Sequence, residues 1–250
     1  MTDTIKTYLA KIEIGAEQAF KNLSIFPLLS DYFSPCDYLA IDDAISKDLV
    51  EVLEIRQNGS APRHKVINKS DRMILIDDGE NPAKTRNQRH IGAMLLIPAK
   101  EIMVIPRSFI KKSRLRRKIN QSPSRRPVKS SRDYMEHFTS VDAQVGALFM
   151  INGKVAGMDC FGSPDTLEKT FMKMLEGYAQ DAARKLDPHV RLKSSKAVAL
   201  DFLQMARESR THIEQSARLA AGWRLKSEGC AGYALAHEDR VLRLAMVAGN

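Results

Sequence analysis

Two apolar segments separated by Asn152-Gly153 limit the possible folds of this chain more than any other feature. Val145–Ile151 and Lys154–Phe161 have the length and composition of strands. Asn-Gly is the pair preferred in two-residue type I′ turns, because both central residues need positive φ. The sequence therefore predicts an antiparallel hairpin at this point, and the fold must contain a sheet that includes it.

A helix is predicted directly after this hairpin. Ser163 is a favourable N-cap residue and Pro164 a favourable first helical residue. Apolar residues then recur at helical spacing over 164–186, namely Leu167, Phe171, Met174, Leu175, Tyr178, Ala182 and Leu186. This face should pack on the sheet. A second helix is predicted at 195–208, where the residues expected to be buried are Val198, Phe202, Leu203 and Met205.

Short apolar or alternating runs predict the remaining strands. They are Tyr8–Ile14, Leu23–Leu29, Leu49–Ile55, His64–Asn68, Met73–Asp77, Ile91–Ile97, Ile102–Ile105, Gly222–Ser227, Cys230–His237 and Arg240–Val247. A short helix is expected at Ile41–Lys47, and a tight turn at 237–239. This order indicates an α+β fold with mainly antiparallel sheet and two principal helices. We expect a single domain over 1–250.

Charge is concentrated in one part of the chain. The net charge is +9, but the stretch from Arg107 to Arg132 holds 11 Lys and Arg and no acid, which leaves 28 bases against 30 acids elsewhere. Its residues predicted to bind nucleic acid or another polyanion are Arg107, Lys111, Lys112, Arg114, Arg116, Arg117, Lys118, Arg125 and Arg126. The alternative is a solvated surface loop over 108–133 that is basic without being functional.

Several functional classes find no support in the sequence. No run of apolar residues is long enough for a transmembrane helix, and the first twenty residues lack the apolar core of a secretory signal. Cys36, Cys160 and Cys230 are widely spaced, which favours reduced thiols and a cytoplasmic location. The scattered histidines predict no metal site, and no motif identifies a cofactor or an oligomeric state.

A polar loop and one acid are the candidate site residues. The stretch from Asp77 to His90 includes Glu80, Arg86, Asn87, Gln88 and Arg89 between two predicted strands. Arg can hold phosphate with two hydrogen bonds, and Glu can accept hydroxyls or act as a base. The alternative is a solvated turn with local ion pairs. Asp159 shares a predicted strand face with Val155, Gly157 and Phe161, so it is either a site carboxylate or a partner of the turn near Ser163.

Five segments of the chain resemble one known family. They read IEIGAEQAFKNLSIFPLL, ILIDDGENPAKTRNQRHI, VIPRSFIKKSRL, VGALFMINGKVAGMDCFGSPDTL and GWRLKSEGCAGYALAHEDRVLRLAM. They are similar to the domain associated with ADP-ribosylglycohydrolases and rhodanese-phosphatases, a domain of unknown function. The resemblance implies a role in ADP-ribose or NAD-linked metabolism. It carries over Glu17, Gln18, Glu80, Asp159 and the stretch Asn87–Arg89 as matches to family motifs.

The chain also departs from the family pattern. Asn81 and Pro82 replace an acid and a leucine, and Phe109 and Lys111 replace a cysteine and a glutamate. Two hypotheses follow. In the first, Glu80 and Asp159 act as catalytic groups in a pocket for an ADP-ribose-like or nucleotide ligand that Glu17 and the residues Arg86–Arg89 bind. In the second, the catalytic groups have been lost, and the chain binds nucleic acid or an acidic partner through 107–132.

Overall fold

The chain forms two compact units. The computed structural model describes residues 3–35, 37–55, 63–77, 89–91, 94–105, 110–112, 131–186, 195–216 and 220–249, with only the backbone of 89–91, 110–112 and 214–216. Unit 1 comprises Met1–Pro35, Gln121–Ile213 and Trp223–Asn250, and unit 2 comprises Cys36–Asn120 and Glu214–Gly222. The expectation of one domain stays a prediction.

A large sheet forms the centre of unit 1. Among the described residues it contains nine strands in the order β1-β3-β12-β13-β17-β16-β15-β14, with β2 paired to β3. The pairings of β1, β2, β3, β12, β13, β16 and β17 with their neighbours are antiparallel. The strands are β1 (Glu13–Ile14), β2 (Gln18–Phe20), β3 (Leu23–Leu29), β12 (Gln144–Ile151), β13 (Lys154–Phe161), β14 (Arg210–Ser216), β15 (Ala221–Lys226), β16 (Cys230–His237) and β17 (Arg240–Ala248).

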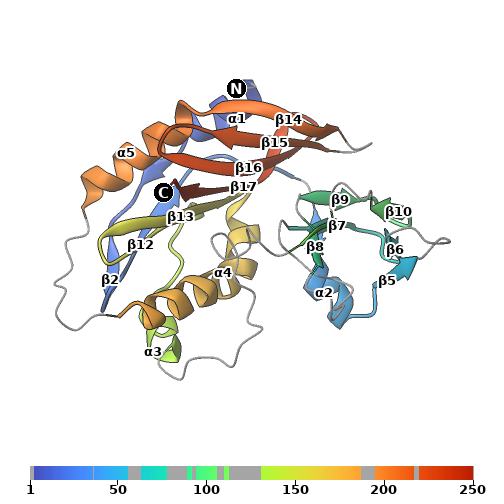
Figure 1. Cartoon of the computed structure of the whole chain (residues 1–250), viewed down its shortest axis with the longest axis horizontal. Helices are drawn as coiled ribbons and strands as arrows, with labels where there is room; N and C mark the ends of the chain where they lie inside the picture. Colours follow the sequence, from blue (N-terminus) through green and yellow to red (C-terminus); the bar gives the residue numbers. More distant parts are fainter. Residues whose placement is uncertain are drawn as a thin grey trace. The chain divides into compact units, whose positions relative to one another are not determined.

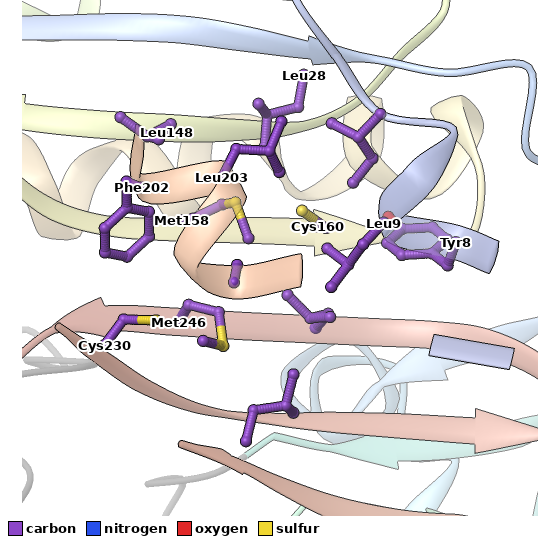
Figure 2. Close-up of a cluster of buried hydrophobic side chains, with 14 of the residues drawn as sticks. Tyr8, Leu9, Leu28, Leu148, Met158, Cys160, Phe202, Leu203, Cys230 and Met246 are labelled. Atoms are coloured by element: carbon purple, nitrogen blue, oxygen red, sulfur yellow. The ribbon is translucent and has the colours of Figure 1, made fainter. Parts of the chain in front are cut away.

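Helices cover both faces of this sheet (Figure 1). On one face, α1 (Asp3–Ala10) and α5 (Lys196–Arg207) bury a core with the sheet that includes Tyr8, Leu148 and Phe202 (Figure 2). On the other face, α3 (Ser131–Met135) and α4 (Pro164–Arg184) bury a second core. The side chains of β12 alternate between the two cores, because successive residues of a strand point to opposite faces of the sheet. The predicted α+β class with mainly antiparallel sheet is confirmed.

The predicted hairpin and the helix after it are both confirmed. Strands β12 and β13 pair antiparallel, and the turn residues Asn152 and Gly153 have φ of 52° and 72°. Helix α4 begins at Pro164, and the Ser163 hydroxyl accepts a hydrogen bond from the Thr166 N–H at 3.3 Å. The turn residues Glu238 and Asp239 also have positive φ, as the tight turn at 237–239 requires.

The predicted strand Tyr8–Ile14 is wrong over most of its length. Residues 3–10 form helix α1, and only Glu13–Ile14 form a strand. The buried residues Ile5, Tyr8, Leu9 and Ile12 recur at helical spacing, and this period decides the local structure. Strands β2 and β14 are not among the strands predicted from the sequence.

Four other predictions need correction. Val198 and Leu186 were expected to be buried but are exposed. The predicted strand Ile91–Ile97 is divided between β8 (Arg89–Ile91) and β9 (Leu95–Ile97), and the predicted loop 108–133 includes β11 (Ile110–Lys112) and the start of α3. Val155 does not share a face with Asp159. A bulge in β13 opposite Phe149 and Met150 reverses the alternation, so Val155 packs in the core under α1 and α5.

Among its described residues, unit 2 contains three small sheets, two of which contribute to one core. Their strand orders are β10-β6-β5, β4-β7-β9 and β11-β8. Besides β8, β9 and β11, unit 2 contains β4 (Tyr38–Ala40), α2 (Ile41–Ser46), β5 (Val50–Ile55), β6 (Arg63–Asn68), β7 (Met73–Ile76) and β10 (Ile102–Ile105). Asn68 fixes the turn after β6, because its amide donates to the carbonyls of Arg72 at 2.8 Å and Pro98 at 2.7 Å.

The turn at Gly153 gives a test of the central hairpin. We expect Gly153→Val to lower the free energy of unfolding by about 1–3 kcal/mol, because a β-branched residue is strained at positive φ. Urea unfolding of the variant measures this loss. Lys154→Val, one residue along, is the matched control and should have little effect, since Lys154 is exposed in an extended strand. Equal stability of the two variants would contradict the assigned turn.

Candidate functional site

Asp159 lies in a buried charged cluster between the central sheet and helix α4. Asp159 is 3% exposed, and Arg243 on β17 is 4% exposed. One carboxylate oxygen of Asp159 accepts a hydrogen bond from Arg243 Nη2, and the other accepts one from the Tyr178 hydroxyl at 2.7 Å. Both carboxylate oxygens therefore have a strong donor inside the protein.

The backbone and one aromatic ring complete the environment of Arg243. Its Nη1 donates to the carbonyls of Cys160 at 3.3 Å and Leu244 at 3.0 Å. The guanidinium lies 4.4 Å from the ring centroid of Phe161. A buried charge is tolerated when it is paired and its remaining donors are satisfied. Arg243 meets this condition through Asp159 and the two carbonyls.

Tyr178 reaches Asp159 because the strand next to it carries no side chain at Gly157. The Tyr178 ring stacks on Phe149, with centroids 3.8 Å apart and planes inclined by 7°. Phe149 is the register partner of Gly157, and a Cβ atom on Gly157 would lie 2.4 Å from the Tyr178 hydroxyl oxygen. The glycine therefore leaves the space in which the tyrosine hydroxyl meets the carboxylate.

This geometry favours a structural role for Asp159. Asp159 is predicted to be either a site carboxylate or a partner of the turn near Ser163, whereas its observed partners come from α4 and β17. The Ser163 hydroxyl caps the helix itself. The catalytic assignment of Asp159 is not tested and stays a prediction. The signal missed in the sequence is Arg243, a charged residue among the apolar residues Val241–Ala248 of β17.

Cys160, next to Asp159, is not placed to act as a nucleophile. Its side chain points to the opposite face, into the core under α1 and α5 (Figure 2). Burial, together with the nearby charge of Asp159, raises the pKa of the thiol to about 12. Since the thiolate is the reactive form, this cysteine is inert at neutral pH. Cys160 is therefore a buried free thiol that packs in the core.

Glu17 lies elsewhere in unit 1. It is exposed and directly precedes β2, which is separated from β13 by β3 and β12 in the sheet. Its neighbour Gln18 exchanges hydrogen bonds with the backbone of Thr139, at 2.9 and 3.0 Å. Gln18 therefore fastens the segment after α3 to the sheet, which is a structural explanation for that part of the family motif.

Unit 2 brings residues of the two predicted binding segments together. Strands β8 and β11 pair antiparallel, with Arg89 opposite Lys112 and His90 opposite Lys111. We call this pair the β8–β11 ribbon. The other predicted ligand residues, Glu80, Arg86, Asn87 and Gln88, lie outside the described residues. So do the other predicted polyanion residues Arg107, Arg114, Arg116, Arg117, Lys118, Arg125 and Arg126.

Metal and membrane sites find no support in the part of the chain that the structure describes. There, no group of three or more His, Cys, Asp or Glu residues could hold a metal ion. Within the same residues, no helix has both the length and the apolar character needed to cross a membrane.

An antiparallel α+β protein with a buried ion pair and a basic ribbon is the class that these features define. The family model of the ARG and Rhodanese-Phosphatase-superfamily-associated Protein domain matches residues 11–129 and 124–247. The chain belongs to this family, as the resemblance in five segments predicted. Neither the curated proteins nor the solved structures include a significant match. The family name links the chain to an ADP-ribose-related context without stating a reaction.

The Asp159 cluster can be tested by removing one partner at a time. We expect Asp159→Asn to lower the free energy of unfolding by about 3–5 kcal/mol, because it leaves the Arg243 charge buried without its counter-charge. The double variant Asp159→Asn/Arg243→Met should lose less than the sum of the two single losses. Urea unfolding of the wild type, the two single variants and the double variant gives a double-mutant cycle, which measures the coupling energy between Asp159 and Arg243. Additive losses, or an Asp159→Asn protein as stable as the wild type, would contradict a structural ion pair.

Alkaline pH should weaken the fold through Tyr8, Tyr178 and Cys160, three groups whose pKa values are raised in the folded protein. Burial raises the pKa of Tyr8 and Tyr178 well above 10.0, and raises that of Cys160 from 9.0 to about 12. The unfolded chain loses these protons at the ordinary pKa values, whereas the folded chain keeps them to higher pH. Their contribution to stability is therefore complete below pH ~9 and is lost as the pH rises above it.

Urea unfolding at a series of pH values measures this loss. Tyr178→Phe should make the decline with pH shallower, because one of the three protons no longer contributes. If the free energy of unfolding stays constant between about pH 8 and pH 11, the three groups do not govern alkaline stability.

Proposed function

We propose that this chain binds an ADP-ribose-like or nucleotide ligand through the phosphates of that ligand. The pairing of Arg89 with Lys112 in the β8–β11 ribbon carries the proposal. Residues directly opposite each other on antiparallel strands have Cα atoms roughly 5 Å apart, and like charges in that position destabilise the pair. A bound phosphate would remove this repulsion, and Arg holds phosphate with two hydrogen bonds.

The position of the ribbon in the sequence also supports a ligand site. In the sequence, β8 is directly preceded by Arg86, Asn87 and Gln88, the other residues predicted to contact the ligand through guanidinium and amide groups. The family context of ADP-ribose agrees with a ligand that carries two phosphates and hydroxyl groups. Asp159 is not needed for this function, since its carboxylate is fully hydrogen-bonded in unit 1.

Arg89→Glu separates ligand binding from stability. We expect ADP-ribose to raise the melting temperature of the wild type, because a ligand that binds only the folded state stabilises it. The variant should lose this shift. Without ligand it should be at least as stable as the wild type, because an acid opposite Lys112 contributes about 0.2–1 kcal/mol. Lys154→Glu, an exposed lysine in unit 1 with the same charge change, should keep the ligand response.

Titration calorimetry and thermal unfolding with ADP-ribose provide the measurements. A wild-type protein that shows neither heat nor a melting shift at millimolar ADP-ribose would refute the proposed ligand. A response lost equally in Arg89→Glu and Lys154→Glu would refute its location in the ribbon.

A second candidate function is binding of nucleic acid through 107–132. The observation that favours it is the run of 11 bases without an acid, to which Lys111 and Lys112 of the ribbon belong. Such binding would consist of phosphate contacts, and its affinity would fall with salt with a log–log slope of about −0.7 to −0.9 per contact. Deletion of residues 113–129 preserves β11 and separates the functions. Duplex binding should disappear, whereas a response to ADP-ribose should persist.

A further inference from the structure

An open pocket in unit 1 lies between the end of α1, the segment after β3 and the turn before β17. Its volume is about 530 Å³, within the range of roughly 300–1,000 Å³ that small-molecule sites have. The residues that matter for its chemistry are Lys11, Tyr32, Phe33, Glu238, Asp239 and Arg240. All of them belong to unit 1.

Hydrogen bonds hold the pocket wall formed by Tyr32 and Phe33 in place. The Tyr32 hydroxyl accepts a hydrogen bond from the Val241 N–H at 2.7 Å, and Arg240 Nη1 donates to the Phe33 carbonyl at 2.8 Å. The Ser34 N–H donates to the Gly162 carbonyl at 2.7 Å. These bonds fasten the segment to the ends of β13 and β17. The pocket is therefore formed before any ligand arrives.

The Tyr32 hydroxyl and the N–H groups of Arg240 are the hydrogen-bond donors of interest in this pocket. Burial raises the pKa of this half-buried tyrosine, so it is protonated at neutral pH, and the charges of Arg240 and Lys11 act in the opposite direction. Both residues line the same pocket as Tyr32, and Lys11 is paired there with Asp31. Since its oxygen already accepts from Val241, the Tyr32 hydroxyl can use its own proton as a donor. Arg240 uses one nitrogen for the Phe33 carbonyl and has further N–H groups.

The carboxylates of the pocket lie in contact with water. Asp31 is 79% exposed and takes Lys11 as its partner at 3.1 Å. Glu238 is 83% exposed, and Asp239 beside it is also exposed. Exposed charges are screened by water and salt, which weakens the repulsion between these acids and an anion as well as the attraction of the exposed Arg240, so the hydrogen bonds that Arg240 donates must hold the anion. The carboxylates can accept hydrogen bonds from hydroxyl groups.

Phe33 provides a flat apolar surface beside these polar groups. Its ring is 55% exposed, although its backbone is fixed through Arg240. An exposed aromatic ring on a fixed backbone is a suitable platform for a nucleic-acid base, because every base can stack on it.

We propose that this pocket binds a nucleoside monophosphate. Arg240 and the Tyr32 hydroxyl hold the phosphate, Phe33 stacks on the base, and Asp239 accepts hydrogen bonds from the ribose hydroxyls. A purely cationic ligand could not use the N–H groups of Arg240 or the proton of the Tyr32 hydroxyl, and Asp31, one of the three carboxylates, is already paired with Lys11. This site consists of unit 1 residues alone and goes beyond the function proposed for the β8–β11 ribbon.

Calorimetric titration with AMP, adenosine and inorganic phosphate tests each part of the site. Phe33→Ala should weaken AMP roughly tenfold, since it removes a stacking contact, and should leave phosphate unchanged. Tyr32→Phe should weaken AMP and phosphate, but not adenosine. Met172→Ala, an exposed apolar residue on α4, is the control for Phe33→Ala. Circular dichroism and melting temperatures establish that each variant is folded.

Arg89→Glu distinguishes this site from the ribbon. The inference holds if Phe33→Ala and Tyr32→Phe weaken AMP while Arg89→Glu does not. It is overturned if AMP does not bind at millimolar concentration, or if it binds equally well to Phe33→Ala and wild type. It is also overturned if only Arg89→Glu removes AMP binding, an outcome that would instead support the function proposed for the ribbon.

Discussion

The ion pair between Asp159 and Arg243 is the interaction on which the arrangement of unit 1 depends. Its two side chains come from neighbouring strands, 84 residues apart in the sequence, and face α4. Tyr178 connects α4 to the ion pair, because its hydroxyl donates a hydrogen bond of 2.7 Å to Asp159. Because a buried charge is costly without its partner, the cluster favours one register of β13 against β17 and one rotation of α4. Gly157 permits this contact by leaving space for the tyrosine.

This constraint changes how the acid in the hairpin should be interpreted. An Asp among apolar neighbours is a reasonable candidate for a site when its partners are unknown. In the structure the partners are present, and neither oxygen remains directed at solvent. The match between Asp159 and the family motif then has a structural explanation, in the same way as the match of Gln18, which binds the backbone of Thr139.

Local signals in the sequence identified the hairpin, the cap at Ser163 and both principal helices, because each depends on residues close together in the chain. Features that depend on distant segments could not be predicted in this way. The bulge that moves Val155 to the other face is set by pairing with β12, and the partner of Asp159 lies on β17. The wrong prediction of a strand where α1 lies has a different cause. The apolar residues there recur at helical spacing, and this spacing is visible in the sequence alone.

The pairing of β8 with β11 also joins segments that are distant in the sequence, and it bears directly on function. The polar loop and the basic segment are distinct stretches of sequence, and each suggested its own ligand. Their pairing places Arg89 opposite Lys112 and His90 opposite Lys111, which joins them into one basic ribbon. Adjacent like charges reduce the stability of a strand pair unless an anion or solvent compensates them. A phosphate-bearing ligand is the compensation common to both hypotheses, so ligand size and salt dependence, more than residue type, must distinguish a nucleotide from a nucleic acid.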